Sequence, residues 1–305
     1  MTLTELRLGK LRFNPTDGVV IFGLLLMSVL TLLFRARVEH WADLFFRDLA
    51  VLAVYVGVIH GARVVPWKWP RFAVRAIAVA LSYGYLFEAV AQLQLGLYGH
   101  WLDGQVLAVE QSVFGVQPIF WLERITSPPL TEWMMFAYIF YFPMYPLLCA
   151  VVFHRHGPGA MEDYLFCLGI TNLLCDIGFI LLPVAGPMAH LGSQFTVPLD
   201  GSVCTAIGEY IRHNLQFPGG SIPSPHCAAA TIMWVMAWRY RRSWFYFLTP
   251  VVLSLYVSTF YCRYHYVSDA VVGVAVAFAA LAAAPGLLRG WDRTVGGEKR
   301  AAGKV

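Results

Sequence analysis

The chain has 305 residues and a formal net charge of +4; 58% of its residues are hydrophobic and only 13% are charged. A soluble domain of this length needs far more charge to cover its surface, so the composition excludes a disordered chain and argues against an ordinary soluble enzyme. Six cysteines without a CxxC pair exclude a disulfide scaffold and give no zinc signature. The composition therefore predicts an integral membrane protein.

Apolar segments that approach or exceed the roughly 20 residues of a spanning helix recur along the chain. In chain order they cover residues 19–34, 49–65, 72–95, 133–153, 164–183, 226–238, 244–262 and 266–288. Arg35-Ala36-Arg37 follows the first where a signal peptide would have a small-residue cleavage site, so we expect this segment to be retained. The pattern predicts an all-α polytopic bundle of about eight transmembrane helices in a single membrane domain.

The basic residues predict the orientation of these spans. With eight spans, sixteen of the 22 Lys and Arg residues fall on one side, together with both ends of the chain. The positive-inside rule places that side in the cytoplasm. The polar, Gly-rich tail 289–305 is expected to be flexible there. On the opposite side lie two long loops, residues 98–132 and 187–225; within them 107–124 is a candidate interfacial amphipathic helix, and 203–217 has helical spacing.

The first segment whose residues could take part in catalysis covers residues 217–226, immediately before a predicted helix. Its glycines let the backbone approach a ligand closely, and a helix start offers unpaired N–H groups to a phosphate. Its serines add hydroxyl donors and its histidine a proton that titrates near neutral pH. A Pro/Gly turn with serine capping is the plain alternative. The residues concerned are Gly219, Gly220, Ser221, Ser224 and His226.

The second segment is the turn between the last two spans, residues 263–269. His265 and Asp269 are four residues apart and share one face of a helix. A carboxylate on one imidazole nitrogen fixes the tautomer and leaves the other nitrogen free to attack; a plain His–Asp surface pair is the alternative. The charge pattern places both segments at the same non-cytoplasmic face. A nucleophile, a general acid and hydrogen-bond donors to a phosphate would therefore meet there without a metal.

These motifs resemble those of the type 2 phosphatidic acid phosphatase (PAP2) superfamily. Residues 223–226, Pro-Ser-Pro-His, are similar to its PSxH motif, and His265 to Asp269 is similar to the HxxxD end of its third motif. Residues 114–118 and 182–187 resemble the subgroup that includes inositol phosphorylceramide synthases. The resemblance implies extra N-terminal helices in residues 1–71, a PAP2-like six-helix core in 72–288 and a tail in 289–305.

The resemblance also implies roles for the matched residues. His265 would form a phosphohistidine, Asp269 would orient it, and His226 would protonate the leaving oxygen. Ser224, Ser221 and the backbone N–H groups of Gly219 and Gly220 would hold the phosphate. No cofactor or metal is implied, and the partners would be a lipid phosphate of the outer leaflet and the bilayer, with no nucleic acid; the oligomeric state stays open.

Two departures from the family pattern concern positive charge. The first motif, K-x6-R-P, is missing. The arginine expected six residues before the nucleophile is replaced by Thr259, whereas Arg263 stands two residues before it. Positions 259 and 263 would share a helix face, so we expect Arg263 to supply the charge of the third motif. Arg212 or His213 would compensate for the missing first motif.

The function predicted from these patterns is phosphate-ester cleavage or transfer on a lipid at the non-cytoplasmic face. Water as acceptor gives a phosphatase, and a lipid alcohol gives a phosphosphingolipid synthase. A transporter or scaffold is the alternative of another class, because Glu88 and Asp176 lie within predicted spans. For Asp176, a hydrogen bond to Asn172 is the simplest expectation. A disulfide among Cys204, Cys227 and Cys262 stays open.

Overall fold

The computed structural model describes residues 5–9, 11–215 and 217–302, with residues 215 and 296–302 described by their backbone alone. Within these residues the regular structure is helical, apart from an antiparallel hairpin of β1 (Leu6–Leu8) and β2 (Leu11–Phe13). The first half of the chain forms α1 (Pro15–Leu33), α2 (Trp41–Gly61), α3 (Lys68–Ala91), α4 (Asp103–Phe114), α5 (Pro118–Trp121), α6 (Pro128–Ile139) and α7 (Tyr141–His156). The second half forms α8 (Pro158–Leu181), α9 (Pro187–Leu191), α10 (Val203–Leu215), α11 (Pro225–Tyr240), α12 (Arg242–Tyr261) and α13 (Val267–Ala302). Short 3-10 turns cover Ala62–Val64, Gln94–Gly96, Leu122–Ile125 and Gly192–Gln194.

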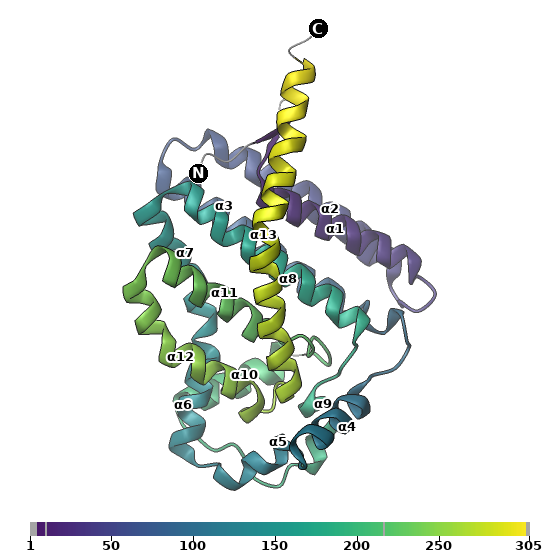
Figure 1. The fold of residues 1–305 in the computed structure, drawn as a ribbon. Helices are drawn as coiled ribbons and strands as arrows, with labels where there is room; N and C mark the ends of the chain where they lie inside the picture. Colours follow the sequence, from purple (N-terminus) through teal and green to yellow (C-terminus); the bar gives the residue numbers. More distant parts are fainter. Residues whose placement is uncertain (1–4, 10, 216, 303–305) are drawn as a thin grey trace.

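Helix α11 forms the centre of the bundle. It packs against α8, α12 and α13, and α8 in turn contacts α1, α3 and α7. Ala228, Ala229 and Ala230 of α11 are fully buried, because small side chains let the surrounding helices approach closely. In Figure 1 the long α13 runs past this centre, while α4, α5 and α9 gather at the opposite end from the C-terminus.

The expected all-α polytopic membrane bundle is confirmed, although fewer helices meet the criteria for a span. Five helices in the described residues are long and apolar enough, or six if α6 and α7, which meet at a 44° bend, form one span. The other two expected spans correspond to α2 and α11. The second of these has only 16 residues, about 24 Å of helix, so it is shorter than the hydrocarbon core.

The C-terminal tail differs from the expectation. Helix α13 continues through the segment from residue 289 to Ala302, for which the sequence predicts a flexible tail. A helix extends more easily than it begins, because each added residue gains one hydrogen bond for one fixed backbone unit. The well-packed part of α13 therefore provides the nucleus for its polar continuation; residues 303–305 lie outside the described part.

A buried ion cluster joins the N-terminal helices to the rest of the bundle. Arg75 of α3 donates to both carboxylate oxygens of Glu162 on α8, at 2.6 and 2.9 Å, and to Asp17 of α1 at 2.5 Å. Tyr55 of α2 donates to the same Asp17 oxygen at 2.6 Å, and Thr16 donates to Glu162. Four helices thus meet at one fully hydrogen-bonded cluster.

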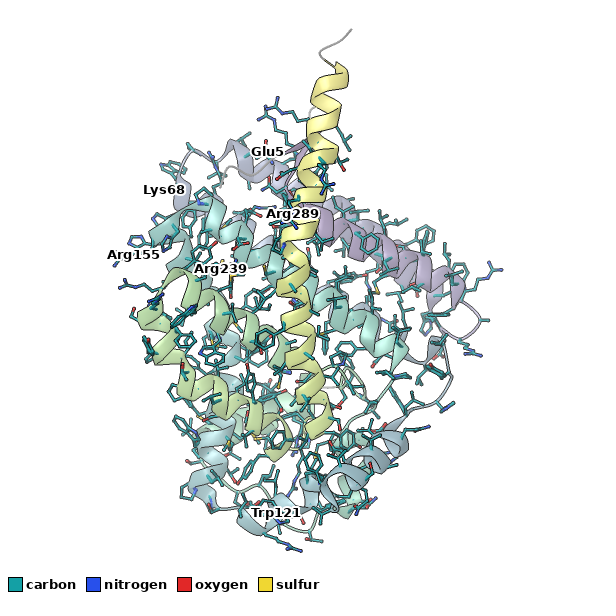
Figure 2. The ribbon with its side chains drawn as sticks, viewed as in Figure 1. Glu5, Lys68, Trp121, Arg155, Arg239 and Arg289 are labelled. Carbon is teal, nitrogen blue, oxygen red and sulfur yellow. The ribbon has the colours of Figure 1, made fainter. Side chains whose placement is uncertain are left out.

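The basic residues gather at one end of the molecule. Figure 2 shows Lys68, Arg155, Arg239 and Arg289, from four separate helices, in the half where both chain ends lie, and Trp121 at the far end. This is the clustering that the charge count predicts; Lys10 and Lys304 lie outside the described residues. Glu88, which lies within a predicted span, is on the exposed surface and pairs with Arg47 at 3.4 Å.

Candidate active site

The two histidines singled out in the sequence meet at the end of the bundle opposite the basic residues. His226 is the second residue of α11, and His265 lies in the turn between α12 and α13. His265 Nε2 is 3.3 Å from His226 Nδ1, within hydrogen-bonding distance, and the ring centroids are 5.5 Å apart. Residues 39 positions apart in the chain are therefore direct neighbours, as the motif spacing predicts.

Backbone contacts hold the starts of α11 and α13 together. Ser224 is the N-cap of α11, where its Oγ accepts from the Cys227 N–H, and Pro225 occupies the first helical position, which needs no N–H partner. The Ser224 N–H donates to the Asp269 carbonyl of α13 at 2.9 Å. A Cβ at Gly273 would collide with the Ser224 carbonyl oxygen, so only glycine permits this approach. The two histidines are thus carried by a rigid junction.

The Ser221 carbonyl, rather than Asp269, is the direct hydrogen-bond partner of His265 Nδ1. This nitrogen is 3.0 Å from the carbonyl oxygen, which can only accept, so Nδ1 carries the proton and Nε2 presents its lone pair. Asp269 Oδ2 lies 3.5 Å from Nδ1. The same oxygen accepts from Ser221 Oγ at 2.5 Å and from the Tyr266 N–H at 2.9 Å. Asp269 therefore places its charge beside His265 while fixing the residues around it.

The backbone donors expected to hold a phosphate are already occupied. The Gly219 N–H donates to the Ala185 carbonyl at 2.9 Å, and the Gly220 N–H donates to Gln94 Oε1 at 2.7 Å. Both glycines have positive φ angles, 107° and 63°. A Cβ at Gly219 would collide with the Gln94 amide, which the sequence offers no motif to identify. These two glycines shape the cavity wall, but their N–H groups are not free.

The two serines have structural contacts as well. Ser221 is buried with its hydroxyl directed to Asp269, and Ser224 is fully buried as the N-cap of α11. Neither lines the cavity described below. The expectation that their hydroxyls face the phosphate therefore does not match their hydrogen bonds.

Arg263 also differs from the expectation that it faces the phosphate. Its guanidinium donates to Glu123 Oε1 at 3.0 Å and to the Val197 carbonyl at 2.5 Å, and it lies 4.2 Å above the Phe195 ring. Burial lowers the pKa of this guanidinium, while Glu123 acts in the opposite direction. The residue has a left-handed backbone, with φ at 64°, so it does not share a helix face with Thr259 as the spacing assumed.

Arg212 of α10 takes the position expected of Arg263. It lines the cavity together with both histidines and forms an ion pair with Glu209 one turn earlier. His213, the other candidate, is exposed and does not line the cavity. A positive charge from the second long loop is thus available beside the histidine pair.

A cavity of about 550 Å³ extends from the histidine pair between α3 and α7. Ala76, Ala80 and Gly84 recur every four residues on one face of α3, so their small side chains leave room for a ligand. Ile77 and Phe142 also line the cavity and remain exposed on the bundle surface, so the space opens laterally where a bilayer would lie. The volume is typical of sites for small molecules or lipid chains.

Sequence comparison identifies the family. A model described as the PAP2 superfamily matches residues 104–283, more than half of the chain. The chain belongs to the PAP2 superfamily. Comparisons with curated proteins and with solved structures give no match. Members of the PAP2 superfamily are phosphoric ester hydrolases or phosphotransferases, and the histidine pair of this PAP2 protein lies inside the matched segment.

Two acidic residues of α4, at the start of the PAP2 match, support the His265 turn. Asp103 accepts from the backbone N–H groups of Ala185 and Gly186 and from the Tyr266 hydroxyl. Glu110 accepts from the Ser268 N–H at 2.7 Å and from its hydroxyl at 2.8 Å, and burial raises the pKa of Glu110. The expected interfacial helix 107–124 is instead divided into α4, α5 and a 3-10 turn, with α4 held against the site.

The cysteines of this PAP2 protein are unpaired, and its described residues form no metal-binding cluster. All six cysteines are free, so Cys204, Cys227 and Cys262 form no disulfide. Among residues 5–9, 11–215 and 217–302 there is no group of three or more His, Cys, Asp or Glu side chains that could hold a metal ion.

Proposed function

We propose that this protein cleaves or transfers lipid phosphate esters through a phosphohistidine on His265. The observation that carries the proposal is the 3.3 Å contact between His265 Nε2 and His226 Nδ1 at the end of an apolar, laterally open cavity. A phosphate head group would lie at the histidine pair, and the lipid chain would follow the gap between α3 and α7. Arg212 would provide positive charge for the phosphate oxygens.

The reaction proceeds in two displacements. The His265 Nε2 lone pair attacks phosphorus, the bond from phosphorus to the leaving oxygen breaks, and that oxygen takes a proton from His226. An acceptor hydroxyl then attacks the phosphohistidine, gives its proton to His226 and breaks the N–P bond. The phosphoryl group must displace the hydrogen bond between the two rings, since no phosphorus atom fits between nitrogens 3.3 Å apart.

The site is proposed to face away from the cytoplasm, because the basic ends of the helices lie at the opposite end of the bundle. The inferred organisation is one membrane domain with residues 1–71 added before the core. The acceptor distinguishes two versions of the function: water gives a phosphatase, and a lipid alcohol gives a synthase of the inositol phosphorylceramide type, which motif resemblances at residues 114–118 and 182–187 favour.

Purified protein in mixed micelles would be given phosphatidic acid, a polyprenyl diphosphate and phosphatidylinositol in turn, with and without a lipid alcohol. We expect His265→Ala to abolish turnover of every donor that wild type cleaves. His213→Ala provides a matched control, because that histidine is exposed and lies outside the cavity. Equal activity of wild type and His265→Ala on all cleaved donors would rule the mechanism out.

A further inference from the structure

The wall of the cavity contains a carboxylate that the reaction just described does not use. Asp176 of α8 is 97% buried, with a relative exposure of 3%, and it lines the same cavity as both histidines. Its Oδ2 has no hydrogen-bond partner in the described structure. The expected hydrogen bond to Asn172 is not formed, although both residues face the cavity from one side of α8.

An unpartnered carboxylate inside a membrane protein is costly, because a buried polar group without a hydrogen bond loses its solvation and gains nothing in return. Two other intramembrane acids avoid this cost, because Asp17 and Glu162 share Arg75. Tyr145, across the cavity on α7, also has a buried hydroxyl without a partner. Asp176 and Tyr145 thus bring two unsatisfied polar groups to the cavity that the histidine pair, Arg212 and Asn172 also line.

The position of Asp176 relates it to the reacting groups. The next turn of α8 passes directly behind the segment that carries the histidine motif, since a Cβ at Gly178 would collide with Pro223. Phe179 is likewise close to Gly220. Asp176 therefore belongs to the part of the cavity wall that α8 forms, and α8 packs against the segment that carries the histidine motif.

We propose that Asp176, with Asn172 and Tyr145, binds the hydrogen-bond donors of a lipid alcohol that accepts the phosphoryl group. This inference rests on the proposed function and selects its transferase version. Water as acceptor requires no such site, and a hydrocarbon chain has no hydrogen-bond donor that could bind the Asp176 carboxyl group. A long-chain alcohol that also bears an amide N–H would satisfy both the carboxylate and the Tyr145 hydroxyl, whereas diacylglycerol offers a single hydroxyl donor.

The test uses the full-length protein with the donor that wild type cleaves and two acceptors, diacylglycerol and an N-acyl long-chain amino alcohol. We expect Asp176→Asn to lower the ratio of transfer to hydrolysis about 10-fold through a higher acceptor KM, as loss of a buried hydrogen bond predicts. Asp48→Asn is the matched control, because Asp48 is a fully buried acid between α2 and α3 that does not line the cavity.

A stability measurement separates binding from a structural role. Removing a buried carboxyl group that has no partner should leave the unfolding temperature of Asp176→Asn equal to or above that of wild type, whereas loss of a structural contact would lower it. In the His265→Ala background, the N-acyl amino alcohol should raise the unfolding temperature, and adding Asp176→Asn should remove that rise.

The outcomes distinguish the two proposals. If wild type cleaves no donor, the proposed function fails and this inference fails with it. If wild type cleaves a donor but forms no product on either alcohol, the hydrolase remains and the acceptor site is refuted. An unchanged acceptor KM in Asp176→Asn, or a lowered unfolding temperature with unchanged transfer, also overturns the assignment.

Discussion

Replacing Asp269 by Asn tests how the charge beside His265 contributes to catalysis. Asn preserves the shape, and its oxygen can still accept from Ser221 Oγ and the Tyr266 N–H, which both bond to one carboxylate oxygen. What disappears is a negative charge 3.5 Å from His265 Nδ1. At an effective dielectric constant of about 20, that charge stabilises a cationic ring by about 4–5 kcal/mol.

The cationic ring exists once Nε2 has bonded to phosphorus, so this energy applies to the transition state rather than to substrate binding. We expect kcat of Asp269→Asn to fall by about three orders of magnitude, with a much smaller change in KM. Ser221→Ala should cost only about 10-fold, because the backbone carbonyl that accepts from Nδ1 remains. Release of phosphate and formation of the phosphohistidine would be followed with a radiolabelled donor.

Asp292→Asn, an exposed substitution far along the same helix, controls for general effects on α13. A kcat for Asp269→Asn within 10-fold of wild type would refute the electrostatic reasoning. So would a larger loss for Ser221→Ala than for Asp269→Asn, because the hydroxyl would then matter more than the charge that it supports.

Three further predictions concern the surroundings of the site. Arg212→Gln should raise KM about 10-fold, whereas Arg263→Gln should mainly lower the unfolding temperature, because only Arg212 lines the cavity. Steady-state kinetics and thermal unfolding would measure both effects, and the reverse pattern would indicate that Arg263, not Arg212, contacts the phosphate. Arg75→Ala should destabilise the bundle by about 3–5 kcal/mol by leaving Asp17 and Glu162 uncompensated, as measured by unfolding in detergent; an effect below about 1 kcal/mol would contradict this reading of the cluster. Burial raises the folded-state pKa of Glu110, so protonation of this carboxyl favours the folded state. Wild type should therefore lose stability relative to Glu110→Gln as the pH rises from about 4 through that pKa. Parallel pH profiles of the two unfolding temperatures would contradict this prediction.

The sequence predicts the architecture and the positions of the two histidines well, because both depend on local patterns. Apolar runs predict helices in a bilayer whatever their neighbours, and the spacing of His226 and His265 is read directly from the chain. Helix limits were less predictable: the expected span 133–153 is bent between α6 and α7, and α13 extends beyond its apolar part.

The partners of the site residues could not be predicted from the sequence, because they come from distant segments. Gln94 accepts a hydrogen bond from the Gly220 N–H, which the motif alone predicts to be available to phosphate. Glu123 pairs with Arg263, which does not line the cavity. The left-handed backbone of Arg263 breaks the helical register on which its expected orientation depended. A motif therefore indicates which groups are present, while long-range contacts decide which of their hydrogen bonds remain free.

The small-residue face of α3 has a practical consequence for dissecting this enzyme. Ala76, Ala80 and Gly84 precede residue 104, where the family match begins, yet they form one side of the cavity. A fragment cut at the family boundary would retain both imidazoles and lose the side of the cavity that is proposed to hold a lipid tail. Such a fragment would keep the histidine pair but lack the α3 side of the cavity that would orient the substrate. Any preference for the length of the lipid chain would then be determined by residues outside the segment that defines the family.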